Sequence, residues 1–136
     1  KLLNLQENND FNIIRDSCIS INKIKTNKFL SSTILDNEKI TLYLASINQR
    51  FKKLLEISEN NLPVEKALAS VKPPVFWKDK PIILTQAKLW NKEKIKKIFN
   101  TIYDVELKIK SNSILDKRVI FKKLFVDICN LANASA

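Results

Sequence analysis

The amino-acid sequence predicts an all-α protein, a compact bundle of about seven helices. Apolar residues recur every three or four positions in several long segments, and no segment of useful length alternates apolar and polar residues. The 136-residue chain contains no glycine, so tight β-hairpins would depend on Asn or Asp alone. Apolar residues make up 45% of the chain, which is enough for a core without disulfides or metals.

The chain is expected to begin with a connection to something else. It starts with a lysine and lacks methionine throughout, and residues 1–9 are polar after three leucines. We interpret these residues as a linker from an upstream domain and place the helical domain at residues 10–136. Asp10 is a candidate N-cap for its first helix. The apolar positions of that helix are spaced as one helical face: Phe11, Ile14, Cys18 and Ile21.

Three further helices are expected before the middle of the chain. A weaker one contains Phe29, Leu30, Ile34 and Leu35 and ends near Asp36-Asn37. The strongest ends at Asn60-Asn61, and its stripe consists of Ile40, Leu44, Ile47, Phe51, Leu54 and Leu55. Pro63 fits the first turn of a short helix with Val64, Ala67, Leu68 and Val71, which Pro73-Pro74 stops.

The second half of the chain is expected to add three helices. One follows Pro81 and runs through Leu89 and Trp90. Asn91 is the candidate N-cap of the next, with Ile95, Ile98, Phe99, Ile102 and Ile109 inside. The last starts after Asp116, and its inward positions are Phe121, Leu124, Phe125, Ile128 and Leu131.

The composition argues against an enzyme. Without glycine the chain has no P-loop and no Rossmann fingerprint, and without histidine it lacks the commonest general base and zinc ligand. Cys18 and Cys129 cannot make a structural zinc site alone, and we interpret them as small buried hydrophobic residues, with a disulfide left open. Asp104 and Glu106 are two apart on a helix and do not face each other. We therefore expect no catalytic residue, metal or cofactor. With no signal peptide or membrane-length apolar run in the sequence, we expect a cytoplasmic protein.

The formal net charge is +10, and it is uneven. Residues 1–71 contribute +2 and residues 72–136 contribute +8. Basic residues cluster at the start of the penultimate helix (Lys92, Lys94, Lys96, Lys97) and on the last helix (Lys117, Arg118, Lys122, Lys123). A solvated face or a phosphate-contacting surface would both explain these clusters. Only three basic residues are arginines, which disfavours base-specific DNA recognition.

Trp77 lies in a proline-stiffened segment and precedes Lys78 and Lys80. An aromatic ring beside two cations can stack on an unpaired base while the lysines hold the backbone, so Trp77, Lys78 and Lys80 are candidate nucleic-acid contacts. The other interpretation is that Phe76 and Trp77 fill a groove between helical layers, with the indole N–H bonded to a carbonyl.

The segment Leu68 to Lys78, with Pro73-Pro74-Val75-Phe76-Trp77-Lys78, resembles part of the delta subunit of bacterial DNA polymerase III. In that family a short helix runs into a Pro-Pro-Val-Phe-Phe-Lys-like segment. Three other stretches resemble the family's long helix, its Leu-Trp-like helix end and the Asp-x-x-Leu-Lys of its penultimate helix: Leu44–Leu55, Gln86–Trp90, and Asp104 with Leu107-Lys108. The resemblance covers nearly all of residues 10–132. The chain departs from it at Trp77, where many relatives have Phe, and at Ser111-Asn112-Ser113, where a glycine is usual.

The resemblance implies that the chain is the C-terminal helical collar domain of a clamp-loader delta subunit. Such a domain joins delta to the other subunits of the hetero-pentamer that loads the sliding clamp on primed DNA. Primer-template DNA would pass nearby, the clamp-binding element would lie upstream, and polymerase chemistry would belong to other subunits. Candidate subunit-interface residues are apolar positions off the main stripes: Leu42, Tyr43, Val119 and Ile120. The alternative is a free-standing helical module that binds single-stranded nucleic acid.

Overall fold

The computed structural model describes residues 2–32, 37–60, 62–71, 78–111 and 116–133, with side chains described from residue 11 onward. These residues form seven α-helices and one 3₁₀ turn, and none of them lies in a strand. The predicted all-α class is confirmed. The helices are α1 (Leu2–Ile19), α2 (Lys23–Ser32), α3 (Ile40–Glu59), α4 (Val64–Ser70), α5 (Lys80–Leu89), α6 (Lys92–Lys110) and α7 (Lys117–Asn133), with η1 (Asn37–Lys39) before α3.

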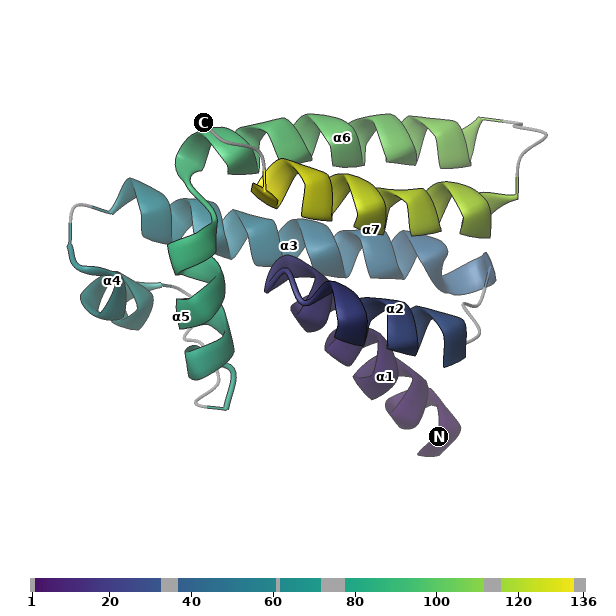
Figure 1. The fold of residues 1–136 in the computed structure, drawn as a ribbon, viewed down its shortest axis with the longest axis horizontal. Coiled ribbons are helices and arrows are strands. Elements are labelled where there is room, and N and C mark those ends of the chain that lie inside the picture. The colour runs from purple at the N-terminus through teal and green to yellow at the C-terminus, as the bar shows by residue number, and fades with distance from the viewer. Residues whose placement is uncertain (1, 33–36, 61, 72–77, 112–115, 134–136) are drawn as a thin grey trace.

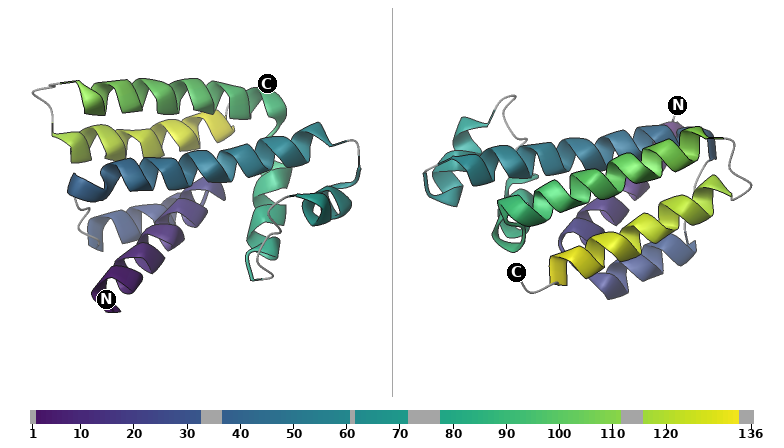
Figure 2. Two further views of the ribbon diagram at one scale, coloured as in Figure 1. Left: turned by 180° about the vertical axis from the view of Figure 1, so that it is seen from behind. Right: turned by 90° about the horizontal axis from the view of Figure 1, so that it is seen from above.

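Helix α3 runs the length of the molecule, and the other helices are arranged around it (Figure 1). α6 lies along the top of the molecule in Figure 1 and packs on both α3 and α7, which run beside it in the view from above (Figure 2). α1 and α2 form a pair at one end, where α1 contacts α7, and α4 and α5 form a pair at the other end against α3. One continuous core joins these parts, with Phe51, Phe121 and Trp90 among its largest fully buried side chains.

Local signals set most helix boundaries correctly. The Asn91 side chain accepts a hydrogen bond from the Lys94 amide at 2.8 Å, which confirms the predicted N-cap of α6. α3 ends at Glu59 with Asn60 as its C-cap, α4 follows Pro63, Pro81 lies in the first turn of α5, and α7 starts after Asp116, close to the expected positions.

The first helix differs from its prediction. α1 begins at Leu2, so Asp10 lies inside a helix and is not an N-cap. Residues 2–9, expected to be a linker, are helical. The predicted continuation of α2 to Leu35 falls on residues 33–36, outside the described part of the chain.

In the turn between α1 and α2, an isoleucine takes a left-handed backbone position that glycine usually occupies. Ile21 adopts a φ of 63°, and the Asn22 amide donates to the Ser17 carbonyl while the Ile21 amide donates to the Cys18 carbonyl. This is a Schellman motif, in which the left-handed position usually belongs to glycine. A β-branched residue there is strained, and Ile21 is compensated by packing against the core.

Candidate functional site

The most distinctive surface in the described part of the chain is the outer side of α6. Its inner side is apolar and buried, formed by Ile95, Ile98, Ile102, Val105 and Ile109. On the outer side, Tyr103 and Leu107 lie one turn apart and are 61% and 49% exposed. Phe99, one turn before Tyr103, is half-buried against the core. We call Phe99, Tyr103 and Leu107 the α6 strip.

A groove of about 380 Å³ runs beside the α6 strip, between α6 and α3. Its apolar lining comes from Leu55 of α3 and from Phe99, Ile102 and Tyr103 of α6. Its polar lining consists of Asn48, Lys52 and Glu106. The groove has no paired carboxylates and no nucleophile next to a base, so its lining fits an inserted apolar side chain rather than chemistry on a substrate.

Charge surrounds the α6 strip along the helix. Lys96 lies two turns before Tyr103, Lys110 lies one turn after Leu107, and both are exposed. Lys94 was expected to face outward in the same lysine cluster, but it is half-buried and its Nζ donates to the Ala132 carbonyl at 2.9 Å. It therefore satisfies the end of α7, as basic side chains near helix C-termini do, and contributes little to the outer surface.

The four candidate interface residues separate into two pairs. Leu42 is 66% exposed and Val119 is 59% exposed, as required of interface residues. Tyr43 and Ile120 are 6% and 7% exposed, so the premise that they lie outside the core is wrong. The Tyr43 ring stacks on Phe11 at 4.2 Å, because α1 contributes to the core at this end and widens the buried face of α3 beyond a single stripe.

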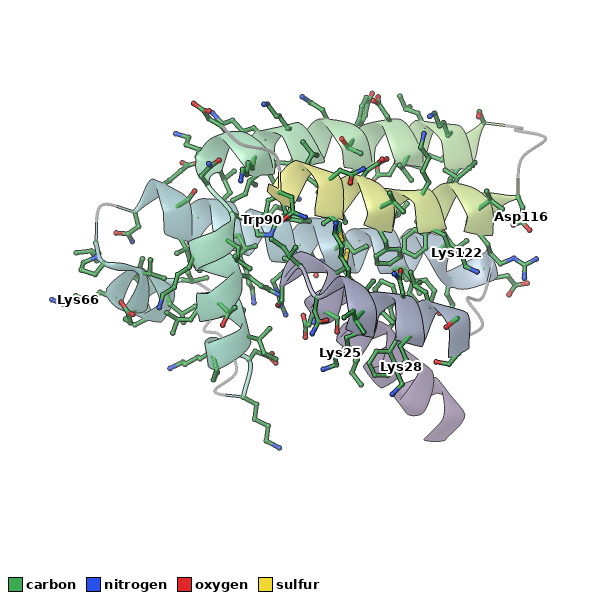
Figure 3. The ribbon with its side chains drawn as sticks, viewed as in Figure 1. Lys25, Lys28, Lys66, Trp90, Asp116 and Lys122 are labelled. Carbon is green, nitrogen blue, oxygen red and sulfur yellow. The ribbon has the colours of Figure 1, made fainter. Side chains whose placement is uncertain are left out.

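The structure describes Lys78 and Lys80 but not Trp77 among the three candidate nucleic-acid contacts. Trp77 and the preceding Pro73-Pro74-Val75-Phe76 lie outside the described residues, so the choice between packing and base stacking stays open. Lys78 and Lys80 are both exposed, and Lys80 is the first residue of α5. Lys25 and Lys28 of α2 also point away from the bundle (Figure 3).

A buried polar cluster lies where α1, α3 and α5 meet. Arg50 of α3 donates to Asp16 Oδ1 at 2.7 Å and to Gln86 Oε1 at 3.0 Å. Gln86 Nε2 donates to the Asp16 carbonyl at 3.2 Å and to Ser20 Oγ at 3.3 Å. Trp90 Nε1 donates to the Ile19 carbonyl at 2.8 Å, inside the molecule (Figure 3). We call Asp16, Arg50, Gln86 and Trp90 the polar junction.

The polar junction is structural in character. Trp90 supplies a donor to the Ile19 carbonyl in the last turn of α1, where helix geometry leaves carbonyls without intrahelical partners. Gln86 adds a second hydrogen bond to the Asp16 carbonyl, which also accepts from the Ser20 amide. Burial, reinforced by the nearby Arg15, holds the pKa of Arg50 below its ordinary value, and Asp16 and Asp79 oppose that shift. Within the described residues every buried side-chain nitrogen or oxygen has a hydrogen-bond partner. No member is left with an unsatisfied group for a substrate.

The described residues contain no group of three or more His, Cys, Asp or Glu side chains placed to hold a metal ion. Among the same residues, no helix combines the length and apolar character needed to cross a membrane. All three arginines form ion pairs with aspartates: Arg15 and Arg50 with Asp16, and Arg118 with Asp116.

Comparison with known proteins returned no family model, no curated protein and no solved structure that matches this chain.

The sequence analysis does not identify the α6 strip, although the sequence contains a signal for it. Tyr103 and Leu107 fall off the stripe formed by Ile95, Ile98, Ile102 and Ile109, at the four-residue spacing that brings two side chains together.

Proposed function

We propose that this chain is an assembly module, the collar-like domain of a DNA polymerase III delta subunit, which joins delta to the other clamp-loader subunits through the α6 strip. In this proposal the domain performs no chemistry. It holds its subunit in the ring that loads the sliding clamp on primed DNA. The occupant of the α6 strip is a helix of a neighbouring loader subunit.

The observation that carries the proposal is the exposure of Tyr103 and Leu107 beside an apolar groove. Tyrosine is enriched among the residues that dominate binding at protein interfaces. Here Tyr103 contributes both to the exposed strip and to the groove wall, so a partner side chain inserted between α3 and α6 would contact its ring. An apolar strip of this kind on a charged helix is typical of helix packing against a second subunit.

Charge favours a partner of opposite sign. Lys96 and Lys110 flank the α6 strip at either end, and Lys52 lies on the α3 side of the groove. A partner surface with an apolar centre and carboxylates at its rim would match this pattern, and the charges would increase the rate and specificity of association. Glu106 is the acidic exception in the groove lining and would select a cation at that point of the partner.

The family resemblance supports the proposal through the positions of its residues. Leu44–Leu55 lies in the longest helix, and Gln86 and Trp90 are buried at the end of α5. Asp104 and Lys108 are exposed near the end of the penultimate helix, beside Leu107 of the α6 strip. The resemblance thus combines residues that fix the fold with residues that remain available to a partner.

The test uses the chain and the remaining loader subunits of its parent organism in size-exclusion chromatography. We expect co-elution, and we expect the chain to compete with full-length delta for the complex. Leu107→Ser should weaken association by about 1–2 kcal/mol, roughly five- to thirtyfold. Leu62→Ser is the matched control, because Leu62 is also 49% exposed but lies in the loop between α3 and α4. A wild-type chain that neither co-elutes nor competes would refute the proposal.

The second candidate function is single-stranded nucleic-acid binding. It is favoured by the exposed Lys78 and Lys80, just before and at the start of α5, and by the predominance of lysine over arginine, which suits phosphate contacts without base specificity. This candidate predicts affinity for a single-stranded oligonucleotide that falls steeply with salt and weakens by about 1–3 kcal/mol in Trp77→Ala. The absence of binding at low salt, measured by fluorescence anisotropy, would exclude it.

A further inference from the structure

The two cysteines of the chain meet in the folded protein although they are far apart in sequence. Cys18 lies on α1 and Cys129 on α7, and both carry free thiols. The Cys18 thiol donates to the Phe125 carbonyl at 3.7 Å, one helical turn before Cys129. The Cys18 thiol therefore lies against the turn of α7 that ends at Cys129.

The thiols differ in access to solvent. Cys18 is fully buried, with an exposed fraction of 0%, whereas Cys129 is 7% exposed. Cys129 lines a groove of about 200 Å³ between α2 and α7, together with Lys23, Thr26, Asn27 and Leu30 of α2. A small molecule that enters this groove reaches Cys129 first, and Cys18 lies behind it.

The two thiols also differ in pKa, and this difference again favours Cys129 as the reactive thiol. Contact with Cys18 lowers the pKa of Cys129 to about 7, and the charge of Lys23 contributes to the same shift. Contact with Cys129 and burial raise the pKa of Cys18. The thiolate is the reactive form of cysteine, so near neutral pH the accessible thiol is also the nucleophilic one.

We propose that Cys18 and Cys129 form a thiol–disulfide exchange site, in which Cys129 attacks a small disulfide in the α2–α7 groove and Cys18 resolves the product. In the first step the Cys129 thiolate forms a bond to one sulfur of the disulfide R–S–S–R, and the other sulfur leaves as R–S⁻, which takes up a proton. In the second step the Cys18 sulfur attacks Cys129, gives up its proton, and releases the second R–SH.

Electrons and protons balance in this exchange. The two protein thiols lose two electrons and two protons, and the small disulfide gains them and becomes two thiols. The product is a Cys18–Cys129 disulfide that joins α1 to α7. A link between positions so distant in sequence constrains the unfolded chain, so oxidation should move the urea midpoint of unfolding to higher concentration. The inference does not depend on the partners of the α6 strip.

The experiment treats the purified chain with cystamine, a small diamine disulfide, and follows the intact mass. We expect loss of two hydrogens with no lasting adduct, and a peptide map without reductant that links the Cys18 and Cys129 peptides. A cystamine adduct that persists on the wild-type chain, two unreacted thiols, or disulfide-linked dimers would each overturn the proposal.

Single variants separate the two roles. In Cys18→Ala the mixed disulfide on Cys129 should accumulate, and in Cys129→Ala Cys18 should remain unmodified. Because a buried substitution can prevent folding, a second measurement uses the wild-type chain alone. Limiting iodoacetamide at neutral pH should label Cys129 at least about tenfold faster than Cys18. Equal labelling of both residues would contradict the assignment of Cys129 as the attacking thiol.

Discussion

The polar junction buries charged and polar side chains, whereas the α6 strip leaves apolar side chains in contact with water. The junction joins three helices, and its members hydrogen-bond to one another and to the last turn of α1. The strip lies on a single helix. Tyr103 has most of its surface exposed to water, and Leu107 about half. The first region stabilises the fold, and the proposed function assigns association to the second, so substitutions in the two regions should change different measurements.

The largest effect on stability is expected at the centre of the polar junction. Asp16→Ala removes the carboxylate that accepts from Arg50 at 2.7 Å and leaves a guanidinium that is only 7% exposed without its charged partner. We expect a loss of about 3 kcal/mol in the free energy of unfolding, measured by urea denaturation. Asp104→Ala, on the exposed side of α6, is the control and should change stability by less than about 0.5 kcal/mol. Equal effects of the two substitutions would mean that Arg50 does not depend on Asp16.

A slightly smaller loss is expected from Trp90→Phe. Phenylalanine keeps an aromatic ring near Phe51, whose ring centroid lies 4.8 Å from that of Trp90, but it has no N–H for the Ile19 carbonyl. Loss of that hydrogen bond and of part of the ring volume should cost about 2–3 kcal/mol. Ile83→Val, which removes one buried methyl group from the same helix and no hydrogen bond, should cost about 1 kcal/mol. Thermal denaturation of both variants compares the two costs.

Outside both regions, the N-cap of α6 provides a smaller effect. Asn91→Ala leaves the Lys94 amide without its side-chain acceptor and should lower the free energy of unfolding by about 1 kcal/mol. Asn91→Ser keeps an acceptor oxygen and should recover most of the loss. An unchanged urea midpoint for Asn91→Ala would show that the amide is equally well satisfied by water.

Local features of the structure were predictable from the sequence, and features that depend on distant neighbours were not. The stripe of α3 and the cap at Asn91 are encoded within a few residues, and both are as expected. Tyr43 and Ile120 were assigned to the surface because the sequence does not reveal how many helices pack against α3 and α7. The contact of Arg50 with Gln86 spans 36 residues, and no local pattern encodes it.

The α1–α2 turn and the candidate site illustrate two further limits. No residue preference identifies Ile21 as the left-handed position, because isoleucine is disfavoured there. Leu42 and Val119 lie off the stripes and are exposed, and Tyr103 and Leu107 of α6 meet the same criterion, although the sequence analysis identifies only the inward positions of that helix. The interface role of all four remains a prediction.

The most direct test of the account is a paired measurement on Tyr103→Ser/Leu107→Ser. Because Tyr103 is mostly exposed and Leu107 about half exposed, the double variant should unfold within about 1 kcal/mol of the wild-type chain in urea. The same variant should fail to co-elute with the clamp-loader subunits and should not compete with full-length delta. An unchanged urea midpoint with lost association is the predicted result. Association equal to that of the wild-type chain would contradict the central claim that the α6 strip is the surface through which this domain assembles.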